Sequence, residues 1–241
     1  MMGSGGVGGY YGARLLQAGH EVAFVARGAH AQAMRKKGLR IRSELGDAHL
    51  SVRVIDDPAQ AGPTDLAVIA EPGIIAQTGK LQRVTLGELD GSRTPRLQAA
   101  VEAFRSAGVE TIASDDIVRV TWEKFVFLSA LSGLTALTRK PIGDVRAHPV
   151  TRSMLLDALR EAVALARAEG AGLDEGFAQK QLEVIDGLPP AMLSSMAQDL
   201  LRGRRLELPW LSGAIVRRAE AHKLRVPTHH AIYGALVLHA G

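Results

Sequence analysis

A glycine-rich loop near the amino end constrains the fold more than any other part of the sequence. Its residues are Gly3, Ser4, Gly5, Gly6, Val7 and Gly8. In the pattern G-x-G-x-x-G, the first glycine permits a tight turn, the second lets the backbone approach a pyrophosphate, and the third lets the following helix pack closely. Alone the pattern is weakly specific, but a predicted helix over residues 10–18 and a predicted strand over residues 21–26 follow at the spacing of a β-α-β unit. We therefore predict that the loop binds a dinucleotide.

The residue after the predicted strand over residues 21–26 bears on which dinucleotide binds. An acidic side chain there would hydrogen-bond the ribose 2′-hydroxyl of NAD, whereas this chain has Arg27. A guanidinium can pair with a 2′-phosphate, so we predict NADP(H) as the cofactor. The alternative is that Arg27 is an ordinary surface arginine at the end of a strand.

The hydrophobic pattern divides the chain into an α/β part and an all-helical part. Turn residues cluster at 91–95, so we predict a Rossmann-type domain over residues 1–94 and an all-α domain over residues 95–241. In the first part we expect a helix over 29–37 and strands over 39–43, 50–55 and 65–70. In the second part we expect helices over 117–138, capped by Ser114, and over 149–170, 175–186, 191–201, 211–222 and 229–239.

A complete dinucleotide-binding domain needs more chain than this sequence has at two points. Only Met1 and Met2 precede the loop, where a strand of about five residues is expected. Residues 71–83 are too few for a second mononucleotide-binding half, which needs β-α-β units of about thirty residues. We predict that the first strand and a central segment after about residue 71 are lacking, through a deletion or an incomplete sequence.

Composition excludes several classes of function. There is no cysteine, so disulfides and thiolate chemistry are excluded. The formal net charge is +4, but the arginines are spread along the chain and aromatics make up 4% of it, so we expect no nucleic-acid partner. No apolar run is long enough to span a bilayer and no export signal is visible, so we expect a cytoplasmic protein without a membrane partner. The histidines form no ligand set, and we expect no metal.

Lys124 enters an otherwise apolar predicted helix within the sequence WEKFVF. Such a lysine either extends its ammonium to water or is held as a functional group, and the residues alone favour the first alternative. Desolvation lowers the pKa of a lysine, which suits a proton donor to a developing alkoxide.

Several motifs together resemble the ketopantoate reductase family over nearly the whole chain. They are GSGGVGGYYGARL, VTLGELDG, SDDI…WEKFVF, LTALTR, SSMAQDL…GRRLE and THHAIYGAL. The resemblance implies a Rossmann domain, a helical domain like that of 6-phosphogluconate dehydrogenase, and reduction of 2-dehydropantoate to pantoate with NADPH. It implies that Lys124 is the general acid, that Ser195 binds substrate, and that Glu207 contacts the cofactor and supports catalysis. From the residues alone, Ser195 could equally be a small hydroxyl packed within a helix, and Glu207 a carboxylate at a helix start.

The sequence differs from the family at positions where the family has asparagines. The substrate-binding asparagines expected four and eight residues after the lysine are replaced by Leu128 and Ser132, and two others by Ile142 and Ser212. Leu128 cannot hydrogen-bond, and Ser132 keeps a shorter hydroxyl.

Three functions follow as hypotheses. The first is reduction of 2-dehydropantoate, and the second is reduction of another branched 2-oxoacid, which the apolar Leu128 and Ile142 favour. The third is a non-catalytic NADP-binding protein, although retention of Lys124, Ser195 and Glu207 argues against it. The resemblance also leaves room for a homodimer formed through the helical domain.

Overall fold

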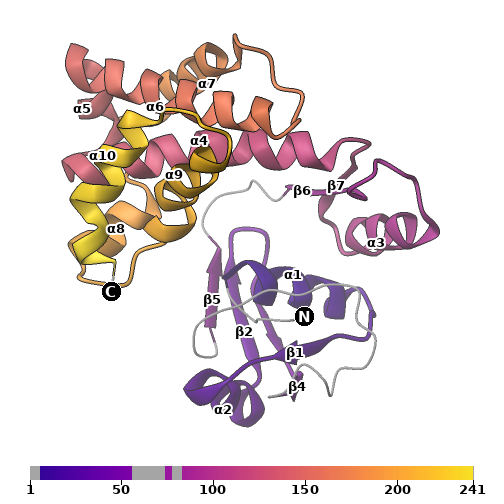
Figure 1. Cartoon of the computed structure of the whole chain (residues 1–241). Helices are drawn as coiled ribbons and strands as arrows, with labels where there is room; N and C mark the ends of the chain where they lie inside the picture. Colours follow the sequence, from indigo (N-terminus) through magenta and orange to yellow (C-terminus); the bar gives the residue numbers. More distant parts are fainter. Residues whose placement is uncertain (1–5, 56–73, 78–82, 241) are drawn as a thin grey trace. The chain divides into compact units, whose positions relative to one another are not determined.

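The computed structural model describes residues 6–55, 74–77 and 83–240 (Figure 1). The chain forms two compact units, Met1–Ile117 and Val118–Gly241. The first is α/β and the second is helical, which confirms the predicted fold class. The predicted boundary at residue 94 lies inside the first unit. The predicted strand over residues 65–70 and loop residues Gly3, Ser4 and Gly5 lie outside the described residues.

The first unit alternates helices with short strands. Its elements are α1 (Gly6–Gln17), β1 (Ala23–Val25), α2 (Gly28–Lys37), β2 (Leu39–Ser43), β3 (Ala48–Leu50), β4 (Arg53–Ile55), β5 (Ile74–Gln77), β6 (Arg83–Leu86), α3 (Pro95–Ser106) and β7 (Glu110–Ala113). β1 pairs with β4 in parallel, and β2 lies between antiparallel β3 and parallel β5. The single strand predicted over residues 50–55 is therefore two strands that pair with different partners.

Apolar residues of β1, α2 and β2 form the core of the first unit. Phe24, Met34, Leu39 and Ile41 are each exposed by 1% or less. The turn from α2 into β2 requires Gly38, whose φ is +70°. A Cβ at this position would lie 2.5 Å from the Leu50 carbonyl oxygen, so a side chain there would displace β3.

The residues around α3 form a further β-α-β unit. β6 and β7 pair in parallel, and α3 connects them. α3 begins with Pro95, and the Leu97 N–H donates to the Thr94 hydroxyl at 3.1 Å, so Thr94 caps the helix. The turn residues at 91–95, which were predicted to separate the two domains, lie instead between β6 and α3 of this unit.

The second unit consists of helices. They are α4 (Ile117–Thr138), α5 (Ile142–Ala147), α6 (Pro149–Ala168), α7 (Phe177–Asp186), α8 (Ser195–Leu201), η2 (Leu208–Trp210), α9 (Ser212–Ala221), α10 (Pro227–Leu236) and η3 (Val237–His239). All the predicted helices are present, and α8 is shorter than predicted because Ser194 caps its first turn. The predicted cap of α4 is wrong: Ser114 accepts a hydrogen bond from the Asp116 N–H in a turn before the helix begins.

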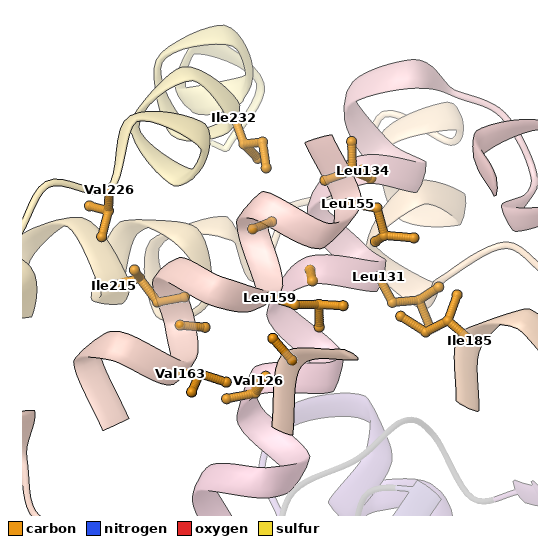
Figure 2. Close-up of a cluster of buried hydrophobic side chains, with 14 of the residues drawn as sticks. Val126, Leu131, Leu134, Leu155, Leu159, Val163, Ile185, Ile215, Val226 and Ile232 are labelled. Carbon is orange, nitrogen blue, oxygen red and sulfur yellow. The ribbon is translucent and has the colours of Figure 1, made fainter. Parts of the chain in front are cut away.

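The second unit is organised around α4 and α6. Figure 2 shows Leu131 and Leu134 of α4, Leu155 and Leu159 of α6 and Ile215 of α9 gathered in one cluster. Each is exposed by 3% or less. Burying one such side chain stabilises a fold by about 1.5–3 kcal/mol, so these helices form a stable support for groups on their outer faces.

A buried histidine joins three helices of this unit. The His229 ring lies 3.0 Å from the Ala158 carbonyl oxygen and 3.2 Å from the Ser212 hydroxyl. Glu161 accepts hydrogen bonds from the Thr228 and His229 N–H groups at the start of α10. Because the ring is fully buried, its protonated form is disfavoured and the pKa of His229 is lowered to about 4.

His229 should make the stability of the protein depend on pH. Between its ordinary pKa of 6.5 and its folded value of about 4, the unfolded chain binds a proton that the folded chain does not. The free energy of unfolding should therefore fall by about 3 kcal/mol as the pH is lowered through this window. Urea unfolding across this range would measure the slope. We expect His229→Gln to flatten it and His230→Gln, at the exposed neighbour, to leave it unchanged; equal slopes in both variants would contradict the assignment.

Candidate functional site

The glycine loop leads directly into a helix. α1 begins at Gly6, so Gly6, Val7 and Gly8 form its first turn. Gly8 is buried and Val7 is 61% exposed. A helix start carries unpaired N–H groups and the positive end of the helix dipole, which suit a phosphate.

Arg27 lies two residues after the end of β1 and stands at the N-cap of α2. Its side chain is exposed, its backbone is extended, and it makes no ion pair with any carboxylate of the described chain. An uncommitted guanidinium just beyond a strand of a β-α-β unit fits a 2′-phosphate. The described residues of this unit therefore fit a dinucleotide with that group.

Lys124 is exposed on α4. This agrees with the first of the two alternatives, in which its ammonium extends to water. Trp122 and Phe125 flank it and pack edge to face, with ring centroids 5.5 Å apart. The Arg218 guanidinium lies over the Trp122 ring at 5.2 Å and pairs with Glu169. These contacts fix the turn of α4 that carries Lys124, while its ammonium stays accessible.

Lys124, Leu128 and Ser132 lie four residues apart and share one face of α4. Thr135 lies on nearly the same face, since eleven residues make about three helical turns. Its hydroxyl is 2.8 Å from Ser194 Oγ, the N-cap of α8. The start of α8 therefore lies along the face that carries Lys124.

Ser132 differs from the other buried polar residues of the described chain. It is 5% exposed, yet its hydroxyl forms no hydrogen bond with any described residue. On the same helix, Ser129 bonds the Val126 carbonyl oxygen and Thr135 bonds the Leu131 carbonyl oxygen. No fully buried side-chain oxygen of the described residues lacks a partner, so the Ser132 hydroxyl lies at the small part of its surface that stays accessible. An accessible hydroxyl without a protein partner is able to bond a ligand.

Ser195 and Glu207 are both exposed. Ser195 is the first residue of α8, while the capping bond comes from Ser194, whose hydroxyl accepts from the Ala197 N–H at 3.1 Å. The alternative of a packed hydroxyl therefore describes Ser194 rather than Ser195. Glu207 precedes η2 without capping it through its side chain, so the alternative of a carboxylate held by the helix start is also not observed. No hydrogen bond or ion pair between described residues links Glu207 to Lys124.

Two residues considered in the sequence analysis lie in the core. Ile142 and Ser212 are each 0% exposed, and Ser212 is bonded to the His229 ring. Of the two apolar residues that favoured a branched 2-oxoacid, Ile142 therefore belongs to the core, and Leu128, which is half-buried, is the one on this face of α4. The capping role of Ser194 could have been predicted from the sequence, because serine is a preferred residue at the N-cap of a helix.

Neither a membrane-spanning helix nor a metal-binding group of side chains is present in the described part of the chain. No helix among them is long and apolar enough to cross a membrane. No group of three histidine, aspartate or glutamate side chains in this part of the chain could hold a metal ion.

Comparisons with known proteins agree with this architecture. The model of the ketopantoate reductase PanE/ApbA C-terminal family matches residues 116–239, and the PanE/ApbA family model matches residues 1–74. The chain belongs to the ketopantoate reductase family. It is therefore an oxidoreductase of a family that uses a nicotinamide dinucleotide, and the match of residues 116–239 agrees with the boundary between the two units.

Relatives cover almost all of the chain. The uncharacterized oxidoreductase YkpB of Bacillus subtilis is 25% identical, over 99% of this chain and 97% of its own. The 2-dehydropantoate 2-reductase of Halobacterium salinarum is 30% identical, over 86% of this chain and 69% of its own. The crystal structure of a PanE/ApbA family ketopantoate reductase from Ralstonia eutropha has a TM-score of 0.87 at 26% identity, covering 99% of this chain and 97% of that one. A ternary structure of D-mandelate dehydrogenase with NADH has a TM-score of 0.81 at 16% identity and shares the fold.

The alignment with YkpB runs over 296 positions, more than the 241 residues of this chain. It therefore contains positions at which YkpB has a residue and this chain has none. The prediction that the missing positions follow about residue 71 stays a prediction.

Proposed function

We propose that the protein reduces a small 2-oxoacid with NADPH, and that 2-dehydropantoate is the best single candidate. The observation that carries the proposal is the face of α4 on which an accessible lysine and an unpartnered serine hydroxyl stand eight residues apart. Arg27, exposed beyond β1, supports NADPH over NADH. Relatives that are 2-dehydropantoate 2-reductases support the choice of substrate.

The chemistry divides between cofactor and protein. A bound reduced nicotinamide supplies the hydride that the ketone carbon receives. The Lys124 ammonium stabilises the negative charge that develops on the ketone oxygen and donates a proton to it. Ser132 and Ser195 bind polar groups of the substrate through their hydroxyls. Glu207 contacts the cofactor and supports catalysis.

A second candidate is another branched 2-oxoacid. Leu128 stands between Lys124 and Ser132 on the face of α4 and offers only an apolar surface. An apolar branched substituent without a hydroxyl would pack against it without loss of hydrogen bonds, whereas a hydroxyl placed there would lose its contact with water. A non-catalytic NADP-binding protein is the third candidate, and catalytic turnover excludes it.

Ser132 should distinguish a hydroxylated substrate from an apolar one. We expect Ser132→Ala to lower kcat/KM for 2-dehydropantoate roughly tenfold, because the terminal hydroxyl of that substrate loses its partner. Trimethylpyruvate has the same carbon branching without this hydroxyl, so its kcat/KM should hardly change. Steady-state kinetics with both substrates measure the difference.

Ser129→Ala provides the matched control, because Ser129 is buried on the same helix but bonds only the Val126 carbonyl oxygen. It should leave the ratio of the two kcat/KM values unchanged. If trimethylpyruvate is the better substrate of the unmodified protein, the second candidate replaces the first. An equal loss for both substrates in Ser132→Ala would contradict a contact between Ser132 and the terminal hydroxyl.

We also propose that the protein forms a homodimer through its helical unit. Val150, Val184, Leu201 and Trp210 of that unit are each more than half exposed and offer apolar surface to a partner. A dimeric ketopantoate reductase of Staphylococcus aureus shares the fold, with a TM-score of 0.79 at 16% identity.

A further inference from the structure

A hollow of about 400 Å³ lies in the first unit, at the carboxyl end of α2. Arg35, Lys36 and Lys37 come from the last turn of α2, Arg40 comes from β2, and His49 comes from β3. Among the residues that the structure describes, no aspartate or glutamate lines the hollow. It therefore brings together the positive charges of α2 and β2, with the imidazole of His49 beside them.

Three cations of this hollow have no anionic partner among the described residues. Within the described chain, no carboxylate lies within 4.0 Å of the charged groups of Lys36, Lys37 or Arg40. Like charges held together repel, and an anion between them relieves this repulsion. Basic residues in a last helical turn also interact favourably with the helix dipole, which accounts for the three residues of α2. That explanation does not extend to Arg40, which belongs to β2.

The walls of the hollow are held in place by backbone contacts. The His49 Nε2 atom donates to the Lys37 carbonyl oxygen at 2.5 Å, which ties β3 to the end of α2. Arg40 and His49 are direct partners in the antiparallel register of β2 and β3. Gly38 sits against the Leu50 carbonyl oxygen with no room for a side chain. The cations are thus carried by fixed elements, which lowers the cost of ordering them around a ligand.

This hollow is distinct from the predicted cofactor site. Arg27 stands at the N-cap of α2, while the hollow is at the opposite end of that helix. The ten residues of α2 make a helix about 15 Å long. A phosphate held by Arg27 therefore cannot also occupy the hollow.

We propose that this hollow is a second anion site, which binds a small metabolite carrying two or more phosphate groups. The lysine and arginine side chains would bond the phosphate oxygens, and the half-buried Val52 beside them would contact an apolar part of the ligand. The volume is within the range of sites that hold small molecules. The cations are confined to one hollow, which favours a compact polyphosphate. A nucleic-acid strand would need a groove that follows its backbone.

Hydrogen–deuterium exchange with tripolyphosphate as the probe would test the site on the full chain. We expect the ligand to slow amide exchange in residues 34–52, and isothermal titration to give a Kd that rises roughly tenfold or more in a Lys37→Gln, Arg40→Gln double variant. Arg42→Gln is the matched control, because Arg42 is exposed on β2 but does not line the hollow. Arg27→Gln should likewise leave the protection of residues 34–52 unchanged.

Several results would overturn the proposal. Protection confined to the glycine loop and Arg27 would place the anion in the cofactor site alone. An equal loss of affinity in Arg42→Gln would show that the anion is attracted by the positive charge of the whole surface and not by a specific site. Tighter binding of a single-stranded oligonucleotide than of tripolyphosphate, at equal phosphate concentration, would show that the partner is nucleic acid. Because the test measures binding and not turnover, it is independent of any catalytic activity.

Discussion

Lys124→Ala should lower kcat for reduction of the 2-oxoacid by roughly a factor of a thousand, because a positioned general acid contributes about two to four orders of magnitude. The affinity for NADPH should stay the same, since Lys124 lies on α4 in the helical unit and the predicted cofactor residues Gly6, Gly8 and Arg27 lie in the other unit. Stopped-flow turnover and fluorescence titration of NADPH measure the two quantities.

Lys140→Ala is the matched control for this prediction. Lys140 is exposed in the turn that follows α4 and carries the same charge, so its removal should leave kcat unchanged. Because Lys124 is exposed, its replacement should also leave the thermal unfolding midpoint nearly unchanged. Retained turnover in Lys124→Ala would show that another group donates the proton.

Arg27→Ala has the second-largest expected effect. It should raise the Kd for NADPH roughly tenfold to a hundredfold, because a charge-assisted contact with the 2′-phosphate is worth about 1.5–3 kcal/mol. The Kd for NADH should not change, since NADH lacks this phosphate. Titrations of both cofactors against the unmodified protein and the variant measure the shift.

Arg53→Ala tests whether the effect is specific. Arg53 begins β4, beside β1, and forms an exposed ion pair with Glu21. Its replacement removes one positive charge from the same sheet and leaves the predicted phosphate site intact. Its Kd for NADPH should change little. An equal weakening of NADPH and NADH in Arg27→Ala would instead show that Arg27 supports the fold of the loop.

The elements of the fold could largely be predicted, because long-range packing agrees with local pattern in most of them. α4 is apolar on nearly all faces, and α6 begins at a proline and ends before a glycine with φ +79°. The domain boundary could not be predicted, because β7 has only four residues and becomes a strand through its pairing with β6. Strands this short carry too little pattern to outweigh the helical periodicity around them.

The residues of the candidate site could be chosen from the sequence, but their environments could not. The type of a residue does not tell how exposed its side chain is. Lys124 is exposed although it lies two residues after a buried tryptophan, and Ile142 is buried although the family has an asparagine at its position. The unpartnered hydroxyl of Ser132 depends on which carbonyl groups lie within reach after folding. The basic hollow depends on the register of β2 and β3, which places Arg40 beside His49.

The most direct test of the proposed function is the rate of NADPH oxidation by the purified protein with 2-dehydropantoate, measured beside NADH and a panel of other branched 2-oxoacids. We predict rapid turnover with NADPH, slower turnover with NADH, and 2-dehydropantoate as the best substrate of the panel. Binding of NADPH without turnover of any 2-oxoacid would contradict the proposal and leave a non-catalytic NADP-binding protein.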